Sequence, residues 1–380
     1  MTQADAPAPP LSSIWSDVDP VAAFGCDYAD ARARFLAAAR ARGLDVETHV
    51  LPGQRGPAGE ELAADVAVLG PATSPAALVL TSATHGVEGF CGSGCQVALL
   101  RDDAFAAYVE RRGVAVVFVH AINPWGFAHV ARTTEDNVDL NRNFRDFAAV
   151  RRNEAYLEIH DFILPASWPP PPEQEARLAA YLGERGAGAL QAALTTGQSD
   201  RPDGLFYAGR KATWSQQVIR DVLRRHARRE RLGWIDFHTG LGPSGHAEKI
   251  FAGPDDAAML ARARAWWGCD VTSIYDGSST SAQVTGMLFN AALGECPDSA
   301  YAGIALEYGT LPMPEVTQAL RARHWLAAHP EATARQRAAV LKLTRDAFFV
   351  DTPAWKAMVA GQARAAALQA LAGLATGGTP

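Results

Sequence analysis

The residues best suited to chemistry lie in one short stretch, residues 84–89, in which His85 and Glu88 are three positions apart. An apolar run at residues 76–80 precedes the stretch and predicts a buried strand, and residues 95–100 after it predict the start of a helix. An imidazole and a carboxylate at such a strand-to-helix turn can point at one atom, and both are ligands that a catalytic zinc takes from a protein. On its own the pair is common and more often belongs to a polar surface turn, so its function depends on what the rest of the chain supplies.

Polar side chains follow three further apolar runs in the same way. They are His120 and Asn123 after residues 114–119, His238 after residues 232–237, and Glu307 after residues 303–306. In open α/β sheets, ligands bind at the carboxyl ends of the strands, so these side chains are expected to meet at one edge. His238 would complete a hydrolytic zinc site of two histidines and one glutamate. Glu307 would then be available to take a proton from zinc-bound water and pass it to a leaving amine.

The order of elements indicates the fold class. Strand-like runs alternate with helical patterns along most of the chain, which favours a central sheet wrapped by helices. We therefore predict an α/β fold, a three-layer α/β/α sandwich with a mixed, mainly parallel central sheet. Residues 1–20 are rich in Pro and Ala and predict a poorly ordered lead-in, whereas residues 21–380 predict one catalytic domain with helical decoration at its C-terminal end.

Composition excludes several classes of function. The chain has 380 residues and a net charge of −6, which argues against a nucleic-acid binder and offers no basic surface for a membrane. No apolar stretch is long enough to span a bilayer, and the N-terminus lacks the pattern of a standard secretory signal, so we expect a cytoplasmic protein. The cysteines have no regular spacing and predict buried free thiols in a reducing compartment. They are Cys26, Cys91, Cys95, Cys269 and Cys296.

Over about residues 76–310, the sequence resembles the zinc carboxypeptidase superfamily. Five elements occur in the order of that superfamily: His85-x-x-Glu88, Asn123-Pro124-x-Gly126-Phe127, the segment 137–144 (Asn-Val-Asp-Leu-Asn-Arg-Asn-Phe), His238 and Glu307. The stretches 236–242 and 307–310 resemble the aspartoacylase and succinylglutamate desuccinylase branch and uncharacterised bacterial branches more than the digestive enzymes. The resemblance implies a hydrolase fold of the carboxypeptidase kind.

The resemblance also implies roles at the metal. His85, Glu88 and His238 would bind one zinc ion per chain. Glu307 would be the general base, and Arg132 would polarise the scissile carbonyl and stabilise the oxyanion. Three alternatives stay open, namely that His238 is a core histidine bonded to Asp236, that Glu307 forms a salt bridge to Arg142, and that Arg132 is an ordinary loop arginine.

Further roles concern the substrate. The resemblance implies that Asn141 and Arg142 grip a substrate carboxylate, because a guanidinium matches a carboxylate bidentately. Asp139 would orient the first zinc histidine from behind. Tyr275 is the best candidate for the tyrosine with which the superfamily caps its substrate, with Tyr207 and Tyr308 as alternatives.

These implications give one hypothesis for function and two alternatives. The hypothesis is a zinc-dependent, carboxypeptidase-like hydrolase that cleaves the amide bond of a peptide or N-acyl amino acid beside a free carboxylate. The alternatives are an N-acyl-amino-acid deacylase of the aspartoacylase kind and a non-catalytic carboxylate-binding protein on the same fold. The expected partner is a small molecule or short peptide with a free carboxylate, and neither nucleic acid nor a membrane. The substrate side chain, the native metal and the oligomeric state are left open.

Overall fold

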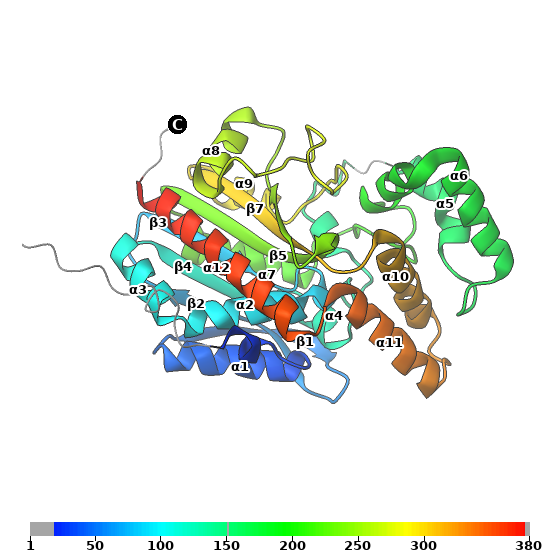
Figure 1. The fold of residues 1–380 in the computed structure, drawn as a ribbon, viewed down its shortest axis with the longest axis horizontal. Coiled ribbons are helices and arrows are strands. Elements are labelled where there is room, and N and C mark those ends of the chain that lie inside the picture. The colour runs from blue at the N-terminus through cyan, green and yellow to red at the C-terminus, as the bar shows by residue number, and fades with distance from the viewer. Residues whose placement is uncertain (1–18, 150–151, 377–380) are drawn as a thin grey trace, which may run out of the picture.

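A seven-stranded mixed sheet forms the centre of the computed structural model, which describes residues 19–149 and 152–376 (Figure 1). Its strand order is β1-β2-β4-β3-β5-β7-β6. The strands are β1 (Val46–Arg55), β2 (Glu61–Leu69), β3 (Ala76–Thr81), β4 (Ala115–His120), β5 (Arg231–Ser244), β6 (Ala247–Phe251) and β7 (Ala300–Gly309). The central strands β4, β3, β5 and β7 are mutually parallel, whereas the pairings β1–β2, β2–β4 and β6–β7 are antiparallel.

Helices cover both faces of the sheet because its central strands are apolar on both sides. Leu78 and Leu80 of β3 enter one hydrophobic core, while Ala77 and Val79 enter the other, as the period of two along a strand requires. The first core is closed by α1 (Tyr28–Ala41), α2 (Gly89–Arg101), α3 (Asp103–Arg112), α8 (Ala257–Trp267) and α12 (Pro353–Thr376). The second is closed by α7 (Trp214–Val222) and α9 (Asn290–Glu295). The predicted three-layer α/β/α sandwich with a mixed sheet is confirmed.

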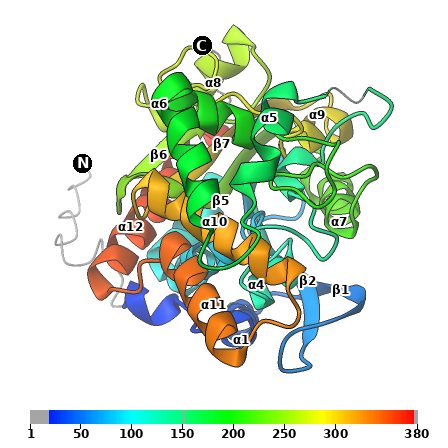
Figure 2. The ribbon, with the colours of Figure 1, turned by 90° about the vertical axis from the view of Figure 1, so that its right-hand side faces the viewer.

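Five further helices lie toward the carboxyl ends of the parallel strands. They are α4 (Pro124–Ala128), α5 (Glu154–Ile163), α6 (Pro172–Thr195), α10 (Met313–Ala328) and α11 (Ala334–Phe348). Figure 2, which looks onto this end of the molecule, shows α6 and α10 in front of the ends of β5 and β7. Helices α5 and α6 pack on each other around a small core of their own, separate from the two cores of the sheet. The edge where ligands are expected is therefore partly covered.

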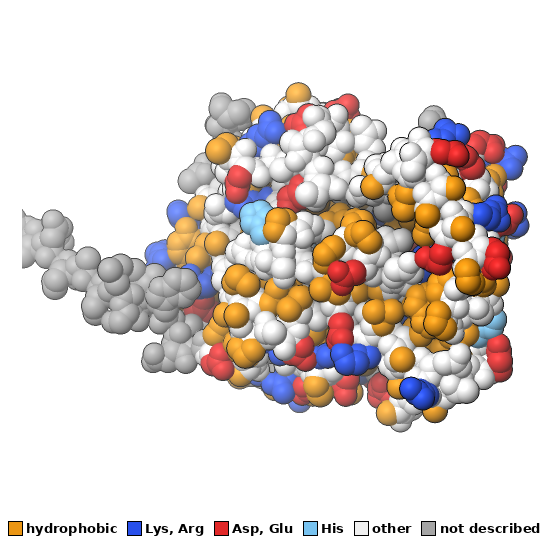
Figure 3. Space-filling model, turned by 45° about the vertical axis from the view of Figure 1, so that its right-hand side comes forward, with side chains coloured by type: hydrophobic (Ala, Val, Ile, Leu, Met, Phe, Trp, Pro, Cys, Tyr) orange, Lys and Arg blue, Asp and Glu red, His pale blue; other side chains and the backbone are white. Residues whose placement is uncertain are grey.

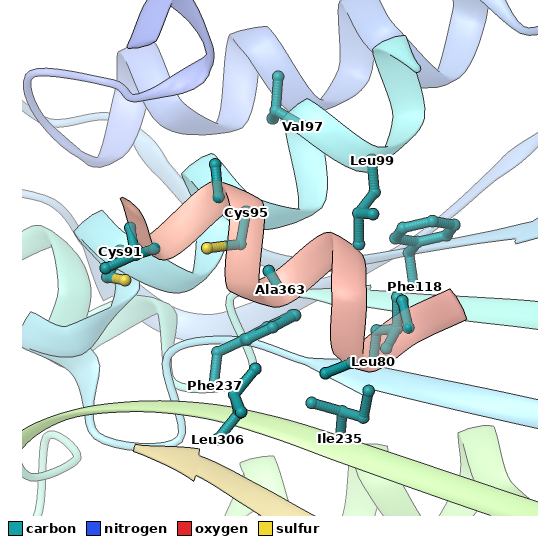
Figure 4. Close-up of a cluster of buried hydrophobic side chains, with 14 of the residues drawn as sticks. Leu80, Cys91, Cys95, Val97, Leu99, Phe118, Ile235, Phe237, Leu306 and Ala363 are labelled. Atoms are coloured by element: carbon teal, nitrogen blue, oxygen red, sulfur yellow. The ribbon is translucent and has the colours of Figure 1, made fainter. Parts of the chain in front are cut away.

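The cysteines beside the metal-binding stretch are packing residues. Cys91 and Cys95 on α2 point into the first core, where Figure 4 shows them near Phe237 and Ala363, and both are fully buried. All five cysteines are free, as predicted. The prediction that all are buried is wrong for Cys26 and Cys269, which are exposed.

One helix differs from its predicted extent. The sequence pattern at residues 215–231 predicts a single helix, but α7 ends at Val222 and is followed by a π-helical turn, Leu223–Ala227. Strand β5 already begins at Arg231, whose guanidinium bonds the carbonyl of Leu374 on α12. Residues 1–18 of the predicted lead-in lie outside the described residues, and the single-domain expectation stays a prediction. Within residues 19–149 and 152–376, no helix has the length and apolar character needed to cross a membrane.

Candidate metal centre

Two neighbouring parallel strands, β3 and β5, deliver the three candidate metal ligands to one edge of the sheet. After β3, the chain turns at Ala83, whose φ of 59° is a left-handed conformation that costs a residue with a side chain about 1–2 kcal/mol. This turn leads into the 3-10 turn Gly86–Glu88, which is preceded by His85. His238 lies on β5, which pairs in parallel with β3. The strand-to-helix turn predicted for His85 and Glu88 is therefore present.

Gly86 is required because two backbones approach closely at this turn. A Cβ atom on Gly86 would lie 2.1 Å from the carbonyl carbon of Gly126 on α4, a distance that real Cβ atoms do not show. The two turns are also bonded, since the amide of Gly86 donates to the carbonyl of Arg132 at 3.1 Å. The glycine thus lets the segment that carries Arg132 lie against the segment that carries His85.

The side chains of His85, Glu88 and His238, which we call the triad, converge on one point. One ligand atom of each lies within 4.8 Å of the other two. The Glu88 carboxylate lies between the imidazoles, with Oε1 2.8 Å from His85 Nδ1 and Oε2 2.9 Å from His238 Nδ1. All three side chains are buried. Burial alone would raise the pKa of Glu88, but the two histidines lower it, so the carboxylate is ionised and ready to act as a ligand.

Each histidine meets a second carboxylate through its other ring nitrogen. Nε2 of His85 lies 3.3 Å from Oδ1 of Asp139, and Nε2 of His238 lies 2.6 Å from Oδ2 of Asp236. Burial opposes ionisation of Asp139, yet Arg132 and His85 hold its pKa well below the usual range. Carboxylates behind metal-binding histidines fix the ring orientation and leave the opposite nitrogen for the metal.

The residues present fit a zinc ion. Two imidazoles and one carboxylate are the protein ligands of known hydrolytic zinc sites. Here their ligand atoms already converge, the outer nitrogen of His238 bonds Asp236, and the outer nitrogen of His85 lies beside Asp139 and Arg132. The site could therefore hold zinc through His85, Glu88 and His238, with the neighbouring cavity left for water and substrate.

Sequence reasoning assigned Asp236 only to the alternative in which His238 is a core residue. The structure contains that bond, and it also turns the other nitrogen of His238 toward Glu88. Asp236 is fully buried and accepts hydrogen bonds from the hydroxyls of Thr81 at 2.6 Å and Thr84 at 2.8 Å. Its spacing of two from His238 on a strand places both side chains on one face, which is the signal that could have identified it.

We expect Asp236→Asn to weaken zinc binding by about 10- to 100-fold, because the amide no longer offers a charged acceptor to His238 Nε2. The measurement is zinc affinity by competition with a chromophoric chelator. Asp270→Asn is the control, since that carboxylate pairs with Lys249 at the surface and lies away from the triad. Equal zinc affinities for Asp236→Asn and the control would show that the Asp236–His238 bond does not support the metal.

Glu307 lies next to His238 and keeps one carboxylate oxygen unbonded. The two residues are register partners on the parallel strands β5 and β7. Oε1 of Glu307 accepts a hydrogen bond from the amide of Leu241 at 3.0 Å, and within the described residues Oε2 has no hydrogen-bond partner. Burial, and then the negative charge of Glu88, raise the pKa of Glu307 to about 8. The alternative of a salt bridge to Arg142 is not present.

This raised pKa makes the stability of the metal-free protein depend on pH. Between the ordinary pKa of 4.5 and about 8, folded Glu307 holds a proton that the unfolded chain has lost, so this group reduces stability as the pH rises. Glu307→Gln keeps the neutral form, and we expect its melting temperature to exceed that of the native protein increasingly from pH 5 to pH 8.5. Thermal unfolding in the presence of a chelator measures this difference. A difference that is constant with pH would contradict the raised pKa.

A cavity of about 120 Å³ opens in front of the triad. Besides the triad and Glu307, it is bounded by polar side chains from the segment after α4 and from α6, and by apolar side chains from the sheet, its loops and α10. The polar ones are Arg132, Asn141, Arg142, Gln191 and Thr195, and the apolar ones include Phe206, Ile250, Ile274, Val284, Met287 and Leu320. Figure 3 shows the molecular surface hollowed on this side, with hydrophobic side chains gathered around the hollow.

Asn141 and Arg142 present donors to this cavity. The buried Arg142 donates from Nε to the carbonyl of Thr195 at 2.7 Å and from Nη1 to that of Asn141 at 2.8 Å. Its Nη2 has no hydrogen-bond partner, and no carboxylate lies within 4 Å of the guanidinium, among the residues that the structure describes. Asn141 Oδ1 accepts from the amide of Leu288 at 2.8 Å, which leaves its NH₂ group available. Both residues are placed to bind an anion.

Arg132 lies directly beside the triad. Its Nε donates to Asp139 Oδ2 at 2.9 Å, its Nη2 lies 2.7 Å from His85 Nε2, and its Nη1 lies 3.5 Å from Glu88 Oε1. It is therefore fixed at the edge of the cavity and is not an ordinary loop arginine. Its role toward a substrate carbonyl stays a prediction.

Segment 202–211, which sequence reasoning missed, holds the arginine-bearing segment in place. Asn137 Nδ2 donates to the carbonyls of Pro202 and Gly204, and Asn143 Nδ2 donates to those of Ala208 and Lys211. Phe206, at φ 52°, places its ring 4.7 Å from the guanidinium of Arg132 and 5.8 Å from that of Arg142. Backbone acceptors some 65 residues away leave no signal in the sequence, although the two flanking asparagines indicate a need for fixed donors.

Tyr275 does not line the cavity. Its hydroxyl donates to the carbonyl of Gly253 at 2.9 Å, and only its neighbour Ile274 lies on the cavity wall. The alternatives are also directed elsewhere, since Tyr308 is buried beside Cys95, and Tyr207 lies outside the wall. A substrate-capping role for Tyr275 stays a prediction, and in this structure its side chain is committed to another contact.

Comparison with known proteins adds a family and a set of similar structures. The model of a family described as "Protein of unknown function (DUF2817)" matches residues 24–362. No curated protein matches the chain. Among solved structures, the chain is similar to a carboxypeptidase A from Helicoverpa armigera, at 14% identity and a TM-score of 0.44, over 88% of this chain and 78% of that one.

Two bacterial structures are also similar. One is a metallo-carboxypeptidase from Pseudomonas aeruginosa, at 15% identity and a TM-score of 0.37, over 88% of this chain and 68% of that one. The other is a murein-tripeptide amidase from Escherichia coli O157, at 14% identity and a TM-score of 0.34, over 75% of this chain and 90% of that one.

Proposed function

The chain belongs to the family described as proteins of unknown function (DUF2817), and we propose that it is a zinc-dependent hydrolase of an amide bond beside a free carboxylate. The observation that carries the proposal is the convergence, on one cavity, of the His85–Glu88–His238 triad, a carboxyl group on Glu307 and the unpaired guanidinium of Arg142. A zinc ion bound by the triad would supply Lewis-acid chemistry, polarising a carbonyl and lowering the pKa of water.

The residues of the chain account for the remaining steps. Arg142 and Asn141 bind the free carboxylate of the substrate and thereby place the adjacent amide before the triad. The positive charge of a zinc ion at the triad would oppose the effect of Glu88 and favour the ionised form of Glu307. The ionised carboxylate takes one proton from the attacking water through Oε2 while the water oxygen bonds to the carbonyl carbon. Arg132 donates hydrogen bonds to the carbonyl oxygen as negative charge develops there. The carbon–nitrogen bond then breaks, and Glu307 returns the proton to the leaving amine.

The cavity favours small substrates. A volume of about 120 Å³, behind an edge partly covered by α6 and α10, leaves room for a short peptide or an N-acyl amino acid at the triad. Dipeptides and N-acyl amino acids both fit this description. A panel of dipeptides and N-acetyl amino acids therefore serves as the substrate screen.

The proposal is tested by blocking the carboxylate of the substrate. Zinc-loaded protein is expected to hydrolyse members of the panel, and to lose at least about 100-fold in kcat/KM when the carboxylate is converted to an amide, since the unpaired donors of Arg142 then lack their charged partner. Arg142→Lys should reduce the discrimination, because lysine cannot bind bidentately. Equal rates on acids and amides would overturn the carboxylate requirement. No hydrolysis, with binding of the acids alone, would favour the non-catalytic binding protein.

A further inference from the structure

The ring of Phe206 lies beside both arginines of the candidate site. The guanidinium carbon of Arg132 is 4.7 Å from the centre of the ring, and that of Arg142 is 5.8 Å from it. Phe206 is 4% exposed and borders the cavity in front of the triad. One uncharged side chain thus adjoins the group proposed to bind the substrate carboxylate and the group proposed to stabilise the oxyanion.

The backbone of Phe206 has a conformation that its residue type disfavours. Its φ of 52° lies in the left-handed region, which a residue with a bulky side chain rarely adopts. Hydrogen bonds fix this turn on both sides. The amide of Leu205 donates to the hydroxyl of Tyr156 on α5 at 2.7 Å. The carbonyl of Phe206 accepts from the amide of Gln198 at 3.1 Å. Such strain persists only where the surrounding structure imposes it, and it clusters at functional sites.

Arg142 is a buried cation without an acidic partner. Burial lowers its pKa to about 10, and the positive charge of Arg132 acts in the same direction. Within the described residues, no carboxylate oxygen lies within 4 Å of its guanidinium, and its Nη2 makes no hydrogen bond. A carboxylate partner would occupy the N–H groups that a ligand needs. The face of an aromatic ring attracts a cation without taking up those donors as a carboxylate does, so Phe206 stabilises Arg142 and leaves Nη2 to a ligand.

The ring also opposes the repulsion between the two arginines. Arg132 has Asp139 as its acidic partner at 2.9 Å, whereas Arg142 is held by two backbone carbonyls. Because the same ring attracts both guanidinia, it favours the arrangement in which both face the cavity. An aliphatic side chain at Phe206 could fill the small core of α5 and α6, to which this residue belongs, but it would not attract a cation.

Resting on the proposed function, we propose that Phe206 is a positioning residue of the site, which acts through Arg142 and Arg132. Its ring holds the two guanidinia in the orientation in which Arg142 meets the substrate carboxylate and Arg132 meets the carbonyl oxygen. It also keeps the buried charge of Arg142 stable before an anion arrives. Loss of the ring should therefore weaken the binding of acids selectively and leave the triad, which is held by the sheet, unchanged.

The test distinguishes the ring of Phe206 from its bulk. Phe206→Leu removes the ring and keeps an apolar side chain in the small core, whereas Phe206→Tyr keeps the ring. The probes are N-acetyl-leucine and glycyl-leucine, each beside its C-terminal amide. Their dissociation constants are measured by calorimetry on zinc-loaded protein that carries Glu307→Gln, so that the probes are consumed slowly.

We expect the Glu307→Gln protein to bind at least one acid about tenfold or more tightly than its amide, because only the acid gives Arg142 a charged acceptor. Phe206→Leu should weaken binding of that acid by about 3- to 30-fold, the range that a cation–π contact contributes, and should change binding of the amide by less than about twofold. Phe206→Tyr should keep most of the affinity. In the Arg142→Gln background, Phe206→Leu should have no further effect on the acid, because its action passes through that guanidinium.

Phe162→Leu is the matched control. Its ring belongs to the same small core and lies 5.0 Å from the guanidinium carbon of Arg177, but it does not line the cavity. This variant should bind acid and amide as the parent protein does. An equal loss of acid binding in Phe162→Leu and Phe206→Leu, or effects of Phe206→Leu and Arg142→Gln that simply add, would overturn the inference.

The outcomes separate this inference from the proposed function, since binding requires no turnover. If the native protein hydrolyses the acids and Phe206→Leu leaves their preference over the amides unchanged, the inference is overturned while the proposed function stands. If neither probe is cleaved but acids bind more tightly than amides through Phe206 and Arg142, the inference is supported although the hydrolase proposal has failed. Equal binding of acids and amides by the Glu307→Gln protein would overturn it.

Discussion

Glu307→Gln is expected to lower kcat by about 10²- to 10⁴-fold, the range that positioned proton transfer contributes, while the zinc content stays that of the native protein. The amide cannot accept the proton of the attacking water, and the bond from the Leu241 amide to its oxygen can be kept. The variant should bind substrates with a nearly unchanged dissociation constant, because Arg142 and Asn141 are untouched. Steady-state assays on the best substrate of the panel measure the decrease in kcat.

Glu248→Gln is the matched control for this variant. Glu248 is the register partner of Glu307 on the neighbouring strand β6, but its carboxylate accepts hydrogen bonds from Thr272 and Thr280 and does not line the cavity. Its variant should therefore keep most of kcat. If zinc-loaded Glu307→Gln has the kcat of the native protein, Glu307 is not required for the reaction and the proposed proton transfer is wrong.

The other large effect concerns the metal. Protein purified without chelator is expected to contain about one zinc per chain by elemental analysis, and His85→Ala and His238→Ala should contain almost none. Each variant removes one of three converging ligand atoms and leaves Glu88 with a single imidazole partner. Added zinc should raise the melting temperature of the metal-free native protein by several degrees, through binding to the folded state, and should leave both variants unchanged.

His329→Ala serves as the control for metal content, since this half-buried histidine bonds Glu331 and stacks on Trp325, away from the triad. Zinc retained by His85→Ala at the native level would show that the ion is bound elsewhere. Absence of zinc from the native protein, even after zinc is added, would contradict the metal site and with it the hydrolase proposal.

The sequence predicts the sheet well because its strands are continuous apolar runs. Residues 76–80 and 114–119 correspond to β3 and β4 within two residues, and the polar groups after them lie at the expected edge. The convergence of His85, Glu88 and His238 also follows from the order of the parallel strands. Local pattern and strand polarity together are sufficient for these features.

Other parts of the site depend on contacts that leave no local pattern. Phe206 reaches Arg132 and Arg142 from a loop without periodicity, and its φ of 52° is a conformation that the residue type does not predict. Residue type alone makes Tyr275 a candidate for the substrate-capping tyrosine, whereas the direction of its side chain is set by the hydrogen bond from its hydroxyl to the carbonyl of Gly253.

The separate core of α5 and α6 gives part of the cavity wall a support other than the sheet. The triad and Glu307 are fixed by the sheet, whereas Gln191 and Thr195 of the cavity wall belong to a helix that packs mainly on α5. The carbonyl of Thr195 also accepts a hydrogen bond from Nε of Arg142, so a substitution that shifts α6 would move the proposed carboxylate-binding group. A substitution at Gln191 reshapes the cavity wall while the triad and Glu307 stay aligned, so this position is the natural starting point for redesigning selectivity.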